Sequence, residues 1–297
     1  RIIKGGIMKQ NESKKVKGLY NSSITRVRPF FKALIGKDKT GESWLPKLLK
    51  ATPLNQGLVK TLCEHPSGLL DDCLQEREYY DKILCKTIKL EKCFEYSIPP
   101  SYSFLEWALM NPDKLIWPED GKKTFGSETQ YKRECLFGYH GKDTQKEIMK
   151  EGLNELKKQG VYYSAGQWWA FEGFTKIDCF LETDDFLLGI EGKRTDKVSP
   201  ATDWFPQRNQ IIRNLEVLKE TAGSKEYALL LMSEDGKDTI KDSDFTNSLP
   251  HYSEQEIAEI KTHYLGALTW QQACEAVGLD FNALPETIRD VSQSIER

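Results

Sequence analysis

One segment, residues 175–194, constrains the fold of this chain more than any other. It holds two runs rich in apolar, β-branched and aromatic residues, TKIDCFLET and FLLGIEGKR, separated by Asp184 and Asp185. Two such runs around a two-residue break are typical of a β-hairpin. If the two aspartates form the loop, Thr183 pairs with Phe186, and the register of every residue further out is then fixed.

This register places Asp178 directly opposite Glu191, with Lys193 two residues further along the second strand. Opposed residues of an antiparallel pair share one face, with Cβ atoms roughly 5 Å apart, and Lys193 shares that face because side chains alternate. Two carboxylates so close raise each other's pKa unless a cation lies between them. Mg²⁺, which takes one or two carboxylates together with phosphate oxygens, meets that need.

Lys193 could then position or deprotonate a water molecule, or stabilise charge that develops on a phosphate. The alternative is that Glu191 and Lys193 form an ordinary surface ion pair of little energetic value.

The elements around the hairpin can also be predicted. Residues 203–221 read as a helix capped by Asp203, and Tyr227–Met232 as a strand buried on both faces. Residues 167–172 read as a further strand. Residues 143–158 read as a helix with a capping box at Thr144 and Glu147 and a stop at Gly160.

The order is thus helix, three strands, helix, strand, and with Asp178, Glu191 and Lys193 it resembles the PD-(D/E)xK nuclease superfamily over residues 127–232. The resemblance implies an α/β fold of the restriction-endonuclease type, in which helices flank a central mixed β-sheet. It implies Mg²⁺ or Mn²⁺ as cofactor, Asp178 and Glu191 as metal ligands, the Gly192 carbonyl as a further ligand, and Lys193 as the catalytic lysine. The superfamily often has proline before the aspartate, where this chain has isoleucine.

The resemblance also implies supporting residues. Many members add an acidic residue from the first helix, for which Glu134, Glu147 and Glu151 are candidates. Glu134 is preferred because Glu147 has the rival capping role. Gln207 and Arg208 match in kind the polar residues that some members carry on the helix after the lysine strand. These two and Asn214, which lies beside the same buried stripe, could instead satisfy backbone groups or reach solvent.

Charge is distributed unevenly along the chain. The net charge is −3, yet residues 1–50 contain 13 Lys or Arg and 3 acidic residues, hence +10, which leaves −13 for the rest. A basic leader suits a polyanion, although a solvated tail would have the same composition. The residues expected to contact nucleic-acid phosphates are Lys14, Lys15, Lys17, Arg26 and Arg28.

Composition narrows the other possibilities. The seven cysteines without a signal peptide indicate a cytoplasmic protein. No apolar run approaches the roughly 20 residues that span a bilayer, so no membrane association is expected. No Gly-rich phosphate loop is present, and neither cysteines nor histidines have the spacing of a zinc site. Met8 is a candidate initiator.

We therefore predict four regions and two possible functions. The regions are a basic leader (1–40), a helical N-terminal region (41–126) with a long helix over 69–94, a nuclease-like α/β core (127–235) and a helical C-terminal extension (236–297). The first function is a Mg²⁺-dependent phosphodiesterase that cuts nucleic acid, DNA in preference to RNA. The second is a noncatalytic nucleic-acid-binding or interaction protein that keeps the fold. A homodimer or a protein partner is compatible with both.

Overall fold

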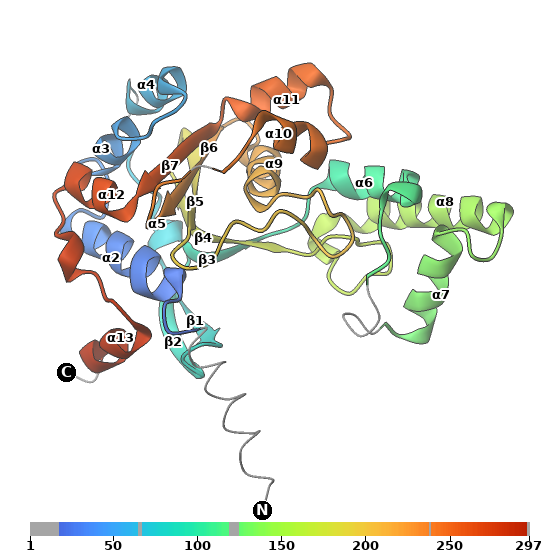
Figure 1. Ribbon diagram of the computed structural model, residues 1–297, viewed down its shortest axis with the longest axis horizontal. Coiled ribbons are helices and arrows are strands. Elements are labelled where there is room, and N and C mark those ends of the chain that lie inside the picture. The colour runs from blue at the N-terminus through green and yellow to red at the C-terminus, as the bar shows by residue number, and fades with distance from the viewer. Residues whose placement is uncertain (1–17, 65–66, 119–124, 238, 296–297) are drawn as a thin grey trace, which may run out of the picture.

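The computed structural model describes residues 18–64, 67–118, 125–237 and 239–295. Met8, Lys14, Lys15 and Lys17 therefore lie outside the described residues. Within them the fold is mixed α/β, with a central five-stranded sheet in the order β3-β4-β5-β6-β7 (Figure 1). The strands are β3 (Phe94–Ile98), β4 (Thr175–Glu182), β5 (Phe186–Gly192), β6 (Glu226–Ser233) and β7 (Tyr264–Thr269).

The sheet is mixed, as the sequence predicts. β4 is antiparallel to both β3 and β5, whereas β5, β6 and β7 run parallel to one another. The hairpin register is also the predicted one. The Thr183 N–H donates to the Phe186 carbonyl at 3.0 Å and closes the two-residue loop, and the last regular pair of the ladder joins Cys179 to Ile190.

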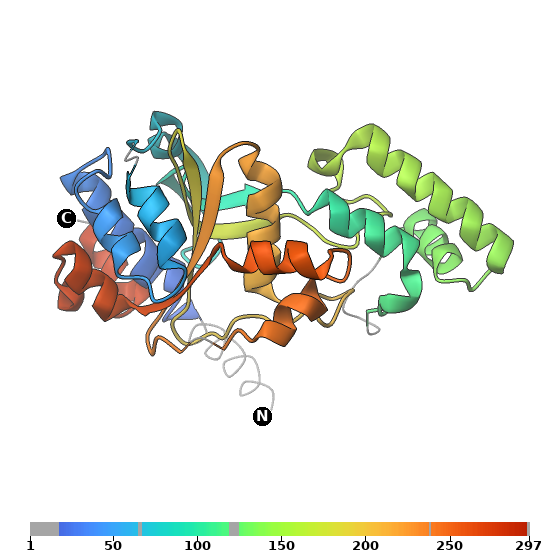
Figure 2. The ribbon, with the colours of Figure 1, turned by 90° about the horizontal axis from the view of Figure 1, so that it is seen from above.

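Helices cover both faces of this sheet (Figures 1 and 2). On one face lie α9 (Gln210–Ala222), α10 (Asp242–Ser248) and α11 (Glu254–Lys261). On the other lie α2 (Arg28–Lys37), α3 (Leu45–Lys50), α4 (Gln56–Glu64) and α12 (Trp270–Val277). Each face contributes its own buried apolar cluster, so the sheet is sandwiched between two cores. The C-terminal α13 (Ile288–Ile295) lies near the short helical segment Ser23–Val27.

Three further helices form a lobe beyond α9, away from the sheet (Figure 2). They are α6 (Tyr102–Met110), α7 (Ser127–Leu136) and α8 (Lys142–Gln159). Their core is rich in aromatic residues and includes Phe104, Trp168, Trp169, Phe171 and Trp204. The predicted stop of α8 at Gly160 is confirmed, but the helix begins after Gly141, and the predicted capping box is not formed.

The prediction of a long helix over residues 69–94 is wrong. This stretch holds the short α5 (Asp71–Leu74), a two-stranded hairpin of β1 (Glu76–Asp81) and β2 (Lys86–Glu91), and the start of β3. The charged residues have good helix propensity, but cross-strand pairing and one-sided packing override it. The region predicted to be helical thus supplies an edge strand of the central sheet.

Two predictions near the hairpin are also wrong. Residues 167–172 form turns rather than a strand, and β3 takes the place beside β4. Residues 203–209 are not helical, and α9 begins at Gln210, because the Asn209 side chain accepts from the Ile211 N–H at 2.9 Å and caps the helix there. In the C-terminal region the two predicted helices are present as α11 and α12, but β7 lies between them and completes the sheet. No helix within the described ranges is both long and apolar enough to cross a membrane.

A buried ion network joins α9 to the lobe. The Arg208 guanidinium contacts Glu172 at 2.9 Å and Glu216 of α9 at 2.6 Å. His251 Nε2 lies 2.5 Å from the other Glu216 oxygen, and the Ser101 hydroxyl donates to that oxygen at 2.7 Å. Burial favours the neutral form of Glu216, but Arg208 and His251 outweigh burial and lower its pKa to about 2.

This network predicts a pH-dependent stability. A carboxyl whose folded pKa is lowered from 4.5 to about 2 contributes stability above pH 4.5 that is lost as the pH falls towards 2. The full contribution is about 3 kcal/mol. We expect Glu216→Gln to be less stable than the parent in urea unfolding at pH 7, and the difference to shrink between pH 4.5 and 2. A difference that stays constant over this range would contradict the assignment.

Candidate metal centre

The hairpin brings two of the predicted site residues together where the regular β4–β5 ladder ends. Asp178 Oδ2 accepts from the Gly192 N–H at 2.8 Å, which ties the aspartate to the end of β5. Asp178 is partly buried, and Glu191 is buried. A Cβ on Gly192 would collide with Val27 and crowd Trp270, so glycine is required for the close approach of the backbone to the Ser23–Val27 segment and to α12.

Lys193 joins them from the residue directly after β5. Its Nζ lies 2.8 Å from Glu191 Oε1, and its backbone N–H donates to the Met232 carbonyl of β6 at 2.7 Å. Burial disfavours the ammonium, but Glu191 and then Asp178 outweigh burial and raise the pKa of Lys193. The side chain therefore carries a proton at neutral pH.

Two amides from the first turns of α9 also donate hydrogen bonds to Glu191. Gln210 Nε2 donates to Glu191 Oε1 at 2.6 Å, and Asn214 Nδ2 donates to Oε2 at 3.2 Å. Of the polar residues named in the sequence analysis, Asn214 therefore bonds to Glu191, whereas Arg208 contacts Glu172 and Glu216 instead; Gln210, which was not named, is the second residue that bonds to Glu191. Gln210 precedes Asn214 by one helical turn, so both side chains lie on the same face of the helix, and this spacing could have identified Gln210 from the sequence.

A third carboxylate, Glu95 of β3, is a neighbour that the sequence did not reveal. Its Oε1 accepts from the Ser23 hydroxyl at 2.6 Å and lies 3.3 Å from Arg28. Its backbone has a φ of +51°, which is uncommon for a residue other than glycine. Its charge is one of the causes that raise the pKa of Asp178.

The electrostatics of the site disfavour the charged form of Asp178. Burial, then Glu191, then Glu95 raise the pKa of Asp178 well above its usual value, and the Gly192 N–H and Lys193 offset this only in part. Burial likewise raises the pKa of Glu191, against the lowering effect of Lys193. A divalent cation with oxygen ligands would relieve this repulsion.

The donor set fits such a cation with Asp178 as its main ligand. Glu191 accepts three hydrogen bonds, and it would have to give up one of them to bind the cation as a second ligand. Across the described ranges, no group of three or more His, Cys, Asp or Glu side chains is arranged to hold a metal ion. Mg²⁺ commonly needs only one or two carboxylates, with waters and substrate phosphates completing its shell.

The remaining predicted residues lie elsewhere. Gln207 is exposed, and Arg208 is enclosed by Glu172 and Glu216. Glu134 lies on α7 in the lobe, where it accepts from Gln130 and contacts His140. Of its two rivals on α8, Glu147 is exposed and Glu151 pairs with Lys132.

Two of the residues that were predicted to contact phosphates, Arg26 and Arg28, are described, and both contact carboxylates within the fold. Arg26, 1% exposed, contacts Glu234 at 2.7 Å. Arg28 contacts Asp81 at 2.7 Å and also lies near Glu95. Carboxylates inside the fold pair with both guanidinium groups. These contacts differ from the prediction that the two side chains reach nucleic-acid phosphates.

Searches of protein-family models, curated proteins and solved structures found no match to this chain.

Proposed function

We propose that this chain is a metal-dependent nuclease of the PD-(D/E)xK type that hydrolyses phosphodiester bonds of nucleic acid, DNA in preference to RNA. One observation carries the proposal: Asp178, Glu191 and Lys193 converge at the end of the β4–β5 hairpin, where burial and the neighbouring carboxylates disfavour the charge of Asp178. The order β3-β4-β5-β6, with α9 connecting the last two strands, supports a restriction-endonuclease-like core.

Each residue then has a defined task. Asp178 would hold the metal ion, with Glu191 and the Gly192 carbonyl as further ligands. A bound Mg²⁺ or Mn²⁺ would supply Lewis-acid stabilisation of charge on the scissile phosphate. Gln210 and Asn214 orient Glu191 through hydrogen bonds. Because Lys193 is protonated, it is suited to stabilise negative charge on the phosphate rather than to remove a proton from water.

The test is cleavage of linear, circular and single-stranded DNA, and of RNA, by the purified chain with Mg²⁺ or Mn²⁺. We expect cleavage that disappears in EDTA and falls by roughly 10² to 10³ in Lys193→Ala, the size of effect typical for loss of one charge-stabilising group. Lys197→Ala is the matched control, since Lys197 is a nearby exposed lysine.

The outcomes separate the two predicted functions. Metal-dependent cleavage lost only in Lys193→Ala supports the nuclease. If no substrate is cut although the chain binds nucleic acid, the noncatalytic binding protein is the correct description.

A further inference from the structure

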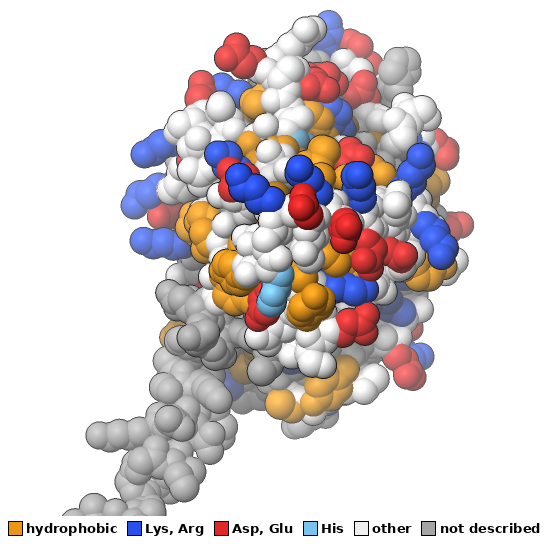
Figure 3. All heavy atoms as spheres, turned by 90° about the vertical axis from the view of Figure 1, so that its right-hand side faces the viewer, with side chains coloured by type: hydrophobic (Ala, Val, Ile, Leu, Met, Phe, Trp, Pro, Cys, Tyr) orange, Lys and Arg blue, Asp and Glu red, His pale blue; other side chains and the backbone are white. Residues whose placement is uncertain are grey.

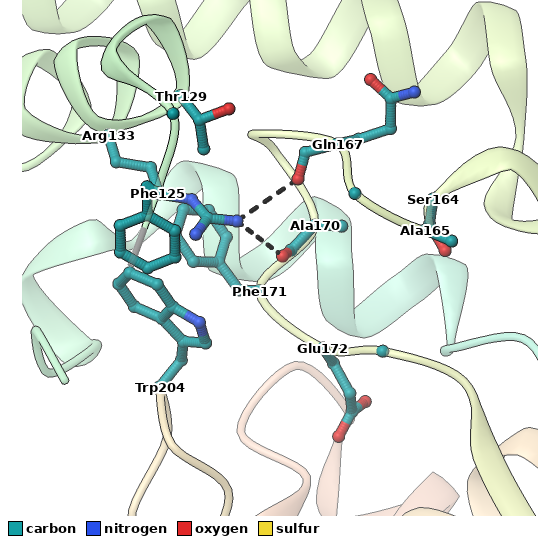
Figure 4. A pocket seen from close by; sticks show the side chains of 13 residues that line it. Phe125, Thr129, Arg133, Ser164, Ala165, Gln167, Ala170, Phe171, Glu172 and Trp204 are labelled. Carbon is teal, nitrogen blue, oxygen red and sulfur yellow. Dashed lines mark hydrogen bonds between the residues drawn. The ribbon is translucent and has the colours of Figure 1, made fainter. Parts of the chain in front are cut away.

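The lobe contains a cavity that the metal centre does not use. It has a volume of about 340 Å³ and lies between α7, residues 164–173 and Trp204 (Figure 4). Arg133 of α7, Phe125 and Phe171 also line it. Both polar and aromatic side chains therefore face this space.

Arg133 places a buried positive charge at the wall of the cavity. Its Nε donates to the Trp168 carbonyl at 2.7 Å and its Nη2 to the Ala170 carbonyl at 3.1 Å. The guanidinium lies over the rings of Phe125 and Trp204, 4.5 and 4.7 Å from their centroids (Figure 4). No carboxylate of the described residues pairs with it, and burial lowers the pKa of Arg133 to about 10.

Arg133 thus has hydrogen-bond partners but no counter-charge among the described residues, whereas a second polar group in the cavity lacks a hydrogen-bond partner. Ser164 is 1% exposed and lines the same space. Its hydroxyl has no hydrogen-bond partner among the described residues. Buried cations and buried hydroxyls both cost free energy unless they are partnered. A ligand with negative charge and acceptor oxygens could pair with Arg133 or accept from the Ser164 hydroxyl, since both residues line the cavity.

An open groove adjoins the cavity and shares Ala165 and Gln167 with it. This groove is lined by Tyr162 and Tyr163, which are 70% and 71% exposed, and by Lys158. Consecutive exposed tyrosines beside an exposed lysine form a surface on which bases can stack and a backbone can be neutralised. Figure 3 looks onto the lobe end of the molecule and shows Lys and Arg side chains interspersed with acidic and hydrophobic ones.

We propose that this lobe binds unpaired nucleotides of a single-stranded nucleic acid. Bases stack on Tyr162 and Tyr163, and a backbone phosphate enters the cavity beside Arg133 and the Ser164 hydroxyl. Stacking needs exposed base faces, which a duplex does not offer along its length.

The inference rests on the proposed function only in taking the bound strand to be the substrate. The loop that lines the cavity leads directly into β4. From Thr175, where β4 begins, to Asp178 is three strand residues, about 10 Å. The loop that would hold the strand is therefore continuous in sequence with the β-strand that carries Asp178.

The experiment measures binding of a fluorescent 15-nucleotide oligothymidylate to the full chain in EDTA by anisotropy. We expect the double variant Tyr162→Ala, Tyr163→Ala to bind about tenfold more weakly or worse, with duplex binding unchanged. Tyr80→Ala is the control, because Tyr80 is 57% exposed and lies on the separate β1–β2 hairpin. Equal affinity of the double variant and the parent overturns the proposal.

Ser164→Ala tests the cavity separately. It removes a hydroxyl that has no partner, so we expect unchanged thermal stability and severalfold weaker binding of the oligonucleotide. Thymidine monophosphate serves as competitor. If it binds as tightly as the oligonucleotide, the ligand is a free nucleotide and the strand proposal fails.

Failure of this inference and failure of the nuclease proposal are distinguishable. Tyrosine-dependent binding without cleavage supports the lobe as a strand-binding surface and refutes the nuclease. Cleavage of single strands that is the same in the tyrosine double variant and the parent refutes the lobe alone.

Discussion

Replacing Asp178 by Asn should have opposite effects on activity and on stability. We expect nucleic-acid cleavage to fall about 10³-fold or more, because the main metal ligand is lost and a metal supplies several kcal/mol of charge stabilisation. We expect the metal-free protein to melt a few degrees higher. The substitution removes a charge that burial, Glu191 and Glu95 disfavour, while the amide oxygen can still accept from the Gly192 N–H.

Thermal unfolding with and without Mn²⁺ checks both halves of this prediction. The parent should gain stability as Mn²⁺ is added, by about 2.7 kcal/mol at a hundred times the dissociation constant, and the variant should gain little. Asp185→Asn is a suitable control because Asp185 is an exposed aspartate of the hairpin loop. If the variant is less stable than the parent in EDTA, the Asp178 carboxylate stabilises the metal-free fold. The proposal that it is a metal ligand whose charge destabilises the metal-free fold is then wrong.

Arg208→Met should be the most destabilising of the substitutions considered. The guanidinium is fully buried, contacts Glu172 and Glu216, and lies 3.9 Å from the ring centroid of Phe104. Its removal leaves two buried carboxylates without their main counter-charge, which costs about 3 to 5 kcal/mol. Urea unfolding of the full chain measures this cost, with Gln207→Ala as the exposed neighbouring control.

The same variant discriminates between two roles for Arg208. A side chain that supports catalysis would, when replaced, reduce cleavage and leave stability nearly unchanged. If Arg208 instead serves to link α9 to the lobe, its replacement would mainly reduce the free energy of unfolding. The observed contacts favour this structural role, and a stable but inactive Arg208→Met variant would contradict it.

The sequence predicts the β4–β5 hairpin well because all the information is local. A two-residue break between apolar runs fixes the register, and the register fixes which residues oppose one another. The ladder pairs Cys179 with Ile190 as that register requires, and Asp178 bonds to Gly192, the residue after its predicted partner Glu191. The end of α8 at Gly160 and the buried strand β6 follow from equally local signals.

The predictions fail where contacts with segments distant in sequence determine the structure. Glu95 reaches the site because β3 pairs with β4, about eighty residues later in the chain, and no local pattern encodes that pairing. By composition Arg26 and Arg28 belong to a basic leader, yet their partners Glu234 and Asp81 are far away in sequence. Residues 167–172 have strand-like composition, but Arg133 binds three of their carbonyls and holds them in turns.

The order of the strands has a consequence for dissecting this chain. Both edge strands of the sheet, β3 and β7, come from outside residues 127–235. A fragment cut to that range would retain β4, β5 and β6 but present unpaired backbone groups along both outer strands. Such open edges template association between chains. The excised core should therefore aggregate instead of folding alone, and a soluble, monomeric 127–235 fragment would show that the edges are dispensable.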